Sequence, residues 1–119
     1  MAALSFREAT MQLVCPAGNL PALQAAVDAG ANAVYAGFRD QTNARAFPGL
    51  NFSDDELRAG VRYAHAKGAK VYLALNTYPD SARLKDWHAA VDKAAAIGCD
   101  AIIAAEMAVL DYAARTHPG

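Results

Sequence analysis

The chain has 119 residues, of which 55% are hydrophobic and 19% charged, with a formal net charge of −1. This length allows one domain but is shorter than the about 250 residues that a complete eight-unit βα barrel takes. No apolar run approaches the roughly 20 residues that span a bilayer, and the N-terminus lacks a secretory signal, so we expect a cytoplasmic protein without a membrane span. Acidic and basic residues are interspersed, which predicts that this segment does not bind nucleic acid.

The cysteine content limits the possible cofactors. Cys15 and Cys99 are too few for a disulfide framework or for a four-thiolate metal or cluster site. We expect both to be buried thiols.

A junction recurs three times along the chain, at residues 30–35, 68–73 and 98–103. Each copy has a glycine, a small residue and a polar residue, followed by a short apolar run. The glycine suits the left-handed conformation that ends a helix, and the apolar run suits a strand buried on both faces. Asn32 and Asp100 are polar residues of the kind found in tight helix-to-strand turns. The junctions therefore predict successive βα units.

Helix signals lie between these junctions. Asn19 is placed to cap the first helix, and residues 53–56 form a capping box, Ser-Asp-Asp-Glu, with Phe52 and Leu57 as a hydrophobic staple. Leu110 and Ala114 form the predicted apolar face of the last helix. In chain order, the expected elements are a strand at 12–15, a helix at 20–29, a strand at 33–36, a helix at 54–67, a strand at 70–75, a helix at 81–97, a strand at 101–105 and a helix at 107–116.

The alternation of strands and helices predicts an α/β fold with a parallel sheet. A doubly wound sheet that binds a dinucleotide would carry G-x-G-x-x-G after the first strand, whereas this chain has Pro-Ala-Gly-Asn at residues 16–19. We therefore expect four βα units that form the N-terminal half of a (β/α)₈ TIM-type barrel over residues 11–119.

Ligands of such folds bind at the carboxyl ends of the strands. The loop after the second expected strand has about 15 residues where two to six are usual, and long loops at this edge are often functional. Arginine side chains suit carboxylate or phosphate, and asparagine both donates and accepts. The candidate substrate-binding residues at this edge are Asn19, Arg39, Asp40, Asn43, Arg45, Asn51, Asn76 and Glu106.

Two of these assignments have a structural alternative. Arg39, Asp40 and Arg45 can instead pair with each other to hold the long loop. Asn76 ends a strand whose Val71, Leu73 and Leu75 are expected to face the helices, so its amide points toward the barrel axis. That amide either binds a ligand or makes a structural hydrogen bond to a neighbouring loop.

The sequence does not identify catalytic residues. His65 and His88 fall within helices and are expected to be solvated, and His117 lies in the C-terminal tail. No Ser-His-Asp, Cys-His or metal-ligand spacing is present, and the acidic residues at the edge are Asp40 and Glu106. The residues alone predict the binding of a small polar or anionic molecule, with no named reaction.

Several separate segments resemble one known family. The segments Cys15–Leu20, Ala25–Asp28, Gly30–Tyr35 and Leu75–Asn76 resemble the N-terminal signature of the collagenase-like peptidase family of unassigned catalytic type. Within that family, Thr42–Arg45, Gly49–Phe52 and Ala89–Asp92 are similar to its UbiU-type branch, which acts in oxygen-independent ubiquinone biosynthesis. The resemblance runs from about Met11 to the end, so residues 1–10 are expected to be an N-terminal extension.

The resemblance implies hydroxylation of a ubiquinone precursor without dioxygen, in a heterodimer with a UbiV-type partner. It also implies a [4Fe-4S] cluster in the full-length relative, held by four cysteines that lie beyond this segment, so neither Cys15 nor Cys99 is carried over as a ligand. Glu106 departs from the aspartate that is more common in relatives. The alternatives are peptidase activity, RNA hydroxylation, which the lack of positive charge disfavours, and a non-catalytic binding or assembly module. We expect the isolated segment to be inactive and to self-associate through exposed edge strands.

Overall fold

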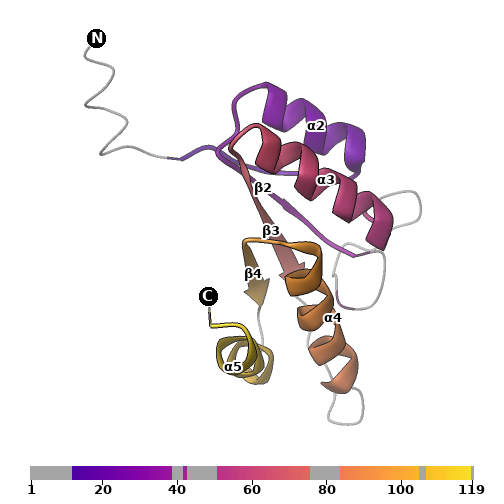
Figure 1. Cartoon of the computed structure of the whole chain (residues 1–119), viewed down its shortest axis with the longest axis vertical. Coiled ribbons are helices and arrows are strands. Elements are labelled where there is room, and N and C mark those ends of the chain that lie inside the picture. Colours follow the sequence, from indigo (N-terminus) through magenta and orange to yellow (C-terminus); the bar gives the residue numbers. More distant parts are fainter. Residues whose placement is uncertain (1–11, 39–41, 43–50, 76–83, 105–106, 119) are drawn as a thin grey trace.

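The computed structural model describes residues 12–38, 42, 51–75, 84–104 and 107–118, and these alternate between strand and helix (Figure 1). The expected extension at residues 1–10 lies outside them. The elements are β1 (Val14–Pro16), α2 (Leu20–Asp28), β2 (Ala33–Ala36), α3 (Asp54–Ala66), β3 (Lys70–Leu75), α4 (Leu84–Ile97), β4 (Ala101–Ala104) and α5 (Met107–Thr116).

The four strands form one sheet in the order β1-β2-β3-β4, and every neighbouring pair is parallel. This confirms the predicted α/β fold with four βα units. A doubly wound sheet reverses its strand order at a switch point, whereas these strands follow one another in sequence, as in the wall of a barrel. That the four units are half of a barrel stays a prediction.

The element boundaries agree closely with the sequence pattern. The helix 107–116 and the strands 33–36 and 70–75 have the predicted bounds, and the first two helices each end one residue earlier than expected. β1 begins and ends later than predicted, at Val14 and Pro16. Ends of elements commonly shift by a residue or two. Residues 81–83 and 105, included in the predictions, lie outside the described part of the chain.

The recurring junction has one structural role in all three copies. Gly30, Gly68 and Gly98 have φ of 104°, 81° and 101°, a region that favours glycine and that ends each helix. In the first and third copies, the polar side chain also bonds to the backbone near the start of the previous strand. Leu13 N–H donates to Asn32 Oδ1 at 2.7 Å, and Val71 N–H donates to Asp100 Oδ2 at 2.8 Å. These two side chains thus help to fix how β2 meets β1 and how β4 meets β3.

The helix starts follow the predicted capping. Ala22 N–H donates to Asn19 Oδ1 at 2.9 Å. In the capping box, Ser53 N–H donates to Glu56 Oε1 at 2.9 Å and Glu56 N–H donates to Ser53 Oγ at 3.2 Å. Both caps lie where their helices leave the carboxyl end of the preceding strand, so they also shape that edge.

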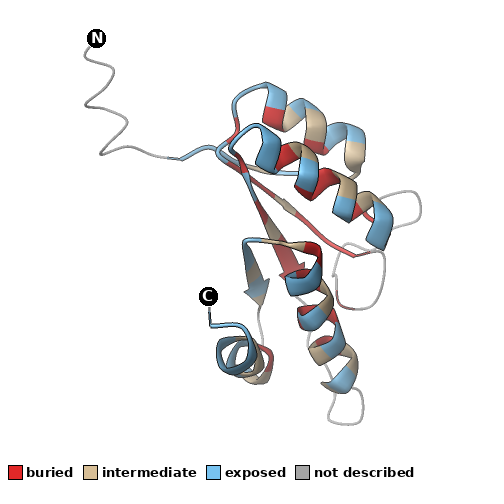
Figure 2. Cartoon of the chain, viewed as in Figure 1, coloured by how far each residue is buried: buried red, intermediate tan, exposed pale blue. Residues whose placement is uncertain are grey.

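The core lies between the helices and one face of the sheet (Figure 2). Val71, Leu73 and Leu75 are fully buried and belong to it, as predicted. In the last helix, the predicted apolar face was wrong. Leu110 and Ala114 are exposed, and α5 instead packs through Val109, Tyr112 and Ala113. Both sets repeat at helical spacing, and the face of α5 that is buried depends on its packing against α4 and β4, so the sequence period alone did not select it. Among the described helices, none is long and apolar enough to cross a bilayer.

Candidate functional site

The loops after β1 and β2 meet at the carboxyl edge of the sheet. Asn51 N–H donates to the C=O of Gly18, which joins the two loops beside Asn19. An isolated parallel bridge joins Phe38, just after β2, to Phe52, just before α3. The structure therefore brings together Asn19 and Asn51, the two predicted site residues that fall within its described part.

Asn51 has features of a constrained position. It has a φ of 75°, the one positive φ among the described residues other than glycine, and it is 7% exposed. Thr42, in the same loop and 1% exposed, is the other buried polar residue in the described part of the chain. Asparagine adopts a positive φ more readily than most residues, so its presence suits the backbone at position 51.

Asn19 has mainly a capping role. Its side-chain oxygen accepts from Ala22 N–H, its carbonyl accepts from Leu23 N–H, and Pro21 has no N–H. Most of the donors that could hold an anion at the start of α2 are thus already used or missing. The other predicted binding residues, Arg39, Asp40, Asn43, Arg45, Asn76 and Glu106, lie outside the described residues.

A cation that the sequence analysis missed lies against the same edge. Lys93 Nζ in α4 is 3.2 Å from Asp54 Oδ1 in the first turn of α3, and 4.3 Å from the centre of the Phe38 ring. These contacts tie α4 to the residue that follows β2. Lys93 sits in the middle of a helix, so nothing in the local sequence indicated this position.

Trp87 adds a polar group that was also missed. Its side chain is in the core at 4% exposure, and its indole N–H has no hydrogen-bond partner among the described residues. Trp87 lies in the first turn of α4, which follows the carboxyl end of β3. The sequence indicated only an apolar residue at this position, and a buried donor of this kind usually has a partner.

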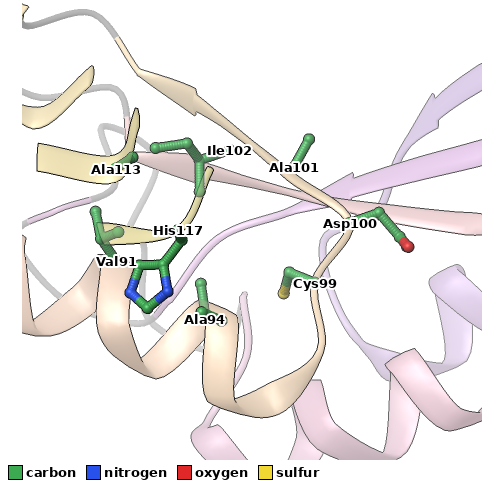
Figure 3. Close-up of a pocket in the computed structure, with 9 residues that line it drawn as sticks. Val91, Ala94, Cys99, Asp100, Ala101, Ile102, Ala113 and His117 are labelled. Carbon is green, nitrogen blue, oxygen red and sulfur yellow. The ribbon is translucent and has the colours of Figure 1, made fainter. Parts of the chain in front are cut away.

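A cavity of about 360 Å³ opens at the opposite end of the sheet, between α4, the start of β4 and α5. Its walls are mostly apolar, and Figure 3 shows the His117 imidazole and the Cys99 thiol beside it. Burial raises the pKa of the Cys99 thiol to about 12, so the thiol stays protonated and is a poor nucleophile. The sequence places His117 in the C-terminal tail and does not indicate a cavity there, because its contact with the cavity depends on how α5 packs.

The three histidines contact groups away from the carboxyl edge. His65 Nε2 is 2.8 Å from Asp100 Oδ2, and His117 Nε2 is 2.9 Å from Asp92 Oδ1. His88 is half-buried and stacks on Tyr112, with ring centres 4.0 Å apart, so the expectation that it is solvated was wrong. Both pairs join neighbouring elements, since His65 in α3 meets Asp100 before β4 and His117 after α5 meets Asp92 in α4.

The residues present do not fit an iron–sulfur cluster. Such a cluster takes four thiolates, and the chain has two cysteines, Cys15 in β1 and Cys99 before β4, both half-buried. The raised pKa of Cys99 further disfavours the thiolate that a metal requires. Within the described ranges, no group of three or more His, Cys, Asp or Glu side chains is arranged to hold a metal ion.

Comparison with known proteins places the chain in a family. The profile of peptidase family U32 matches residues 18–119, which is most of the sequence. The chain belongs to peptidase family U32. The family resemblance noted from the sequence motifs is thereby confirmed.

Relatives of this U32 chain have names that refer to different activities. It is 36% identical over 108 residues to the tRNA hydroxylation protein P of Helicobacter pylori. The aligned region covers 91% of this chain and 25% of that protein. It is 37% identical over 103 residues to an uncharacterized protease of Methanocaldococcus jannaschii, covering 87% and 25%. It is 32% identical over 102 residues to a collagenase of Porphyromonas gingivalis, and the aligned region covers 86% of this chain and 24% of that protein. The chain thus spans about a quarter of the length of these relatives.

Proposed function

We propose that this chain is the N-terminal portion of a hydroxylation protein, and that the carboxyl edge of its sheet binds a polar or anionic part of the substrate. The observation that carries the proposal is its 36% identity, over 91% of the chain, to a protein named for tRNA hydroxylation. The joined loops after β1 and β2, with buried Thr42 and Asn51, support a preformed binding edge.

Within this proposal, the substrate is a ubiquinone precursor, hydroxylated without dioxygen in the cytoplasm together with a UbiV-type partner. The support is the similarity of Thr42–Arg45 and Gly49–Phe52 to the UbiU-type branch. Arg39 and Arg45 would bind a carboxylate of the substrate. The [4Fe-4S] cluster of the full-length relative would lie outside this segment, because two cysteines cannot supply four thiolates.

Hydroxylation of tRNA is the second candidate, favoured by the similarity to the tRNA hydroxylation protein P of Helicobacter pylori. The net charge of −1 counts against contact between this segment and the RNA backbone, although other parts of a longer protein can provide that contact.

Peptidase activity is the third candidate and is supported by the names of two other relatives. A peptidase needs an activated nucleophile, a metal or a carboxylate pair. In the described residues, His65 and His117 pair with aspartates and the Cys99 thiol is protonated, which weighs against this candidate.

Deletion of the gene from its host tests the three candidates together. Cells would be grown without oxygen, their quinones and the nucleosides of their total tRNA would be measured by mass spectrometry, and their extracts assayed on denatured collagen. We expect the unhydroxylated ubiquinone precursor to accumulate, with tRNA nucleosides unchanged. Loss of a hydroxylated nucleoside with normal ubiquinone would instead establish the tRNA candidate. Loss of collagen cleavage alone would refute hydroxylation.

A further inference from the structure

The cavity between α4, the start of β4 and α5 has the size and lining of a small-molecule site. Its volume of about 360 Å³ lies within the about 300–1,000 Å³ that is usual for ligand pockets, and about 150 Å³ is already enough for benzene in an apolar interior. It lies at the amino end of the strands, away from the carboxyl edge. Most of its lining is aliphatic and comes from Val91, Ala94, Ala95, Ala101, Ile102 and Ala113.

Three polar side chains also line this cavity, and they differ in what they can offer a ligand. The Cys99 thiol is protonated, because burial raises its pKa to about 12, and a thiol is a weak donor. Asp100 Oδ2 already accepts from Val71 N–H. His117 uses Nε2 for its bond to Asp92, while its Nδ1 has no hydrogen-bond partner among the described residues. Figure 3 shows the His117 ring beside the aliphatic wall of the cavity.

Two hydrogen bonds to Asp92 determine which nitrogen of His117 carries the proton. His117 Nε2 lies 2.9 Å from Asp92 Oδ1, and Tyr112 Oη–H donates to Asp92 Oδ2 at 2.8 Å. The bonds from His117 and Tyr112 hold the pKa of Asp92 below its ordinary value, so its carboxylate is ionised and only accepts. Nε2 therefore carries a proton, and in the neutral imidazole Nδ1 is then an acceptor. A hydroxyl group is the matching donor on a ligand.

The surroundings of His117 Nδ1 favour a ligand without charge. Among the described residues that line the cavity there is no arginine or lysine to neutralise an anion, and the carboxylate of Asp100 would repel one. A charged group would also lose its hydration against the aliphatic walls. An uncharged molecule avoids both costs and still makes the hydrogen bond.

We propose that this cavity is a second binding site, which holds a small uncharged molecule with an apolar body and a hydroxyl group that donates to His117 Nδ1. Asp92 acts as a positioning residue, because it holds the tautomer of His117 from outside the cavity. A ligand in this place contacts both α4 and α5, so it stabilises the folded arrangement of the two helices by mass action. The proposal does not depend on the function proposed for the carboxyl edge.

The probe is 4-ethylphenol, whose hydroxyl is still protonated at about pH 8. Its binding to the purified ¹⁵N-labelled protein is followed through the backbone amide signals in two-dimensional NMR spectra. We expect saturable shifts centred on the lining residues, with a dissociation constant of about 1 mM or below for a ligand of this size. Ethylbenzene lacks the hydroxyl and should bind about 5-fold more weakly. The anion 4-ethylbenzoate should bind at least about 10-fold more weakly.

A pair of variants tests the role of His117. His117→Phe keeps a ring at the cavity but removes the acceptor, so we expect 4-ethylphenol to lose its about 5-fold advantage over ethylbenzene. His88→Phe is the matched control, because His88 stacks on Tyr112 at the contact between α4 and α5 and does not line the cavity. This control should keep the advantage. Each variant is judged by the ratio of its two dissociation constants, in which a general change in packing cancels.

The proposal is overturned if the wild-type protein shows no saturable shifts at the lining residues with 4-ethylphenol up to about 10 mM. It is also overturned if ethylbenzene or 4-ethylbenzoate binds the wild-type protein as tightly as 4-ethylphenol does. A His117→Phe variant that retains the same preference as the His88→Phe control would refute the hydrogen bond on which the ligand class rests.

Discussion

Replacing Asp100 with alanine tests the role that the structure gives to the polar residue of the junctions. Asp100 Oδ2 accepts from Val71 N–H at 2.8 Å and lies 2.8 Å from His65 Nε2. Val71 is fully buried, so Asp100→Ala leaves its N–H without this acceptor. An unsatisfied buried donor costs about 1–3 kcal/mol, and the solvent-exposed pair with His65 adds at most about 1 kcal/mol. We expect a loss of about 2 kcal/mol in the free energy of unfolding.

Asp100→Asn separates the two contributions. It keeps an oxygen that accepts from Val71 N–H but removes the negative charge beside His65, so we expect a loss below about 1 kcal/mol. Asp55→Ala is the control, because Asp55 is 98% exposed and pairs only loosely with Arg58, at 3.5 Å. Its effect should stay within about 0.5 kcal/mol.

Urea denaturation followed by far-UV circular dichroism measures all three variants at one protein concentration. With a slope of about 1–3 kcal/mol per molar urea, Asp100→Ala should lower the midpoint by about 1 M. This stabilising role of Asp100 is refuted if Asp100→Ala unfolds at the same urea concentration as the Asp55→Ala control. It is also refuted if Asp100→Asn is as unstable as Asp100→Ala, since the oxygen would then contribute nothing.

Three further predictions concern the other local features. Ser53→Ala removes the side-chain acceptor of the capping box and should lower the free energy of unfolding, measured by urea denaturation, by about 1 kcal/mol. An unchanged free energy would show that this bond does not stabilise the helix. Gly98→Ala should lower the free energy of unfolding by about 1–2 kcal/mol, because its φ of 101° is strained for alanine. The new methyl group adds no clash, since it would lie an ordinary 3.6 Å from Val61, and an unchanged melting temperature would contradict this expectation. His117 and Tyr112 hold the pKa of Asp92 below its ordinary 3.8, so its stabilising effect is present above that pH and is lost as the pH falls toward the lowered pKa. The stability difference between wild type and Asp92→Asn should therefore shrink on acidification, and a constant difference would argue against the assigned contacts.

Most of the fold was predictable because its signals are local. The glycine of each junction ends a helix through its own φ, and the capping box is contained within residues 53–56. Such features depend on a few adjacent residues and not on the rest of the fold. The buried face of α5 was predicted incorrectly because it depends on which neighbours the helix contacts, and both candidate faces repeat at the same period.

The site was less predictable because it depends on contacts between distant segments. The edge itself followed from the strand order, and Asn51 was correctly placed there. Its bond to Gly18 joins two loops that are far apart in the sequence. The contact of Lys93 with Asp54 and Phe38 likewise depends on how α4 packs against α3. No spacing rule relates Cys99 to His117, which share a cavity only because α5 returns to the start of β4.

We propose above that the carboxyl-edge loop after β2 binds the substrate of a hydroxylation reaction. The most direct test reintroduces the gene into the deletion strain with Arg39→Gln and Arg45→Gln. The measured quantity is the ratio of ubiquinone to its unhydroxylated precursor. The matched control gene carries Arg58→Gln and Arg62→Gln, which remove the same charge from the exposed face of α3. At equal protein levels by immunoblot, we expect the loop variant to accumulate precursor while the control restores ubiquinone. Equal restoration by both genes would contradict the account.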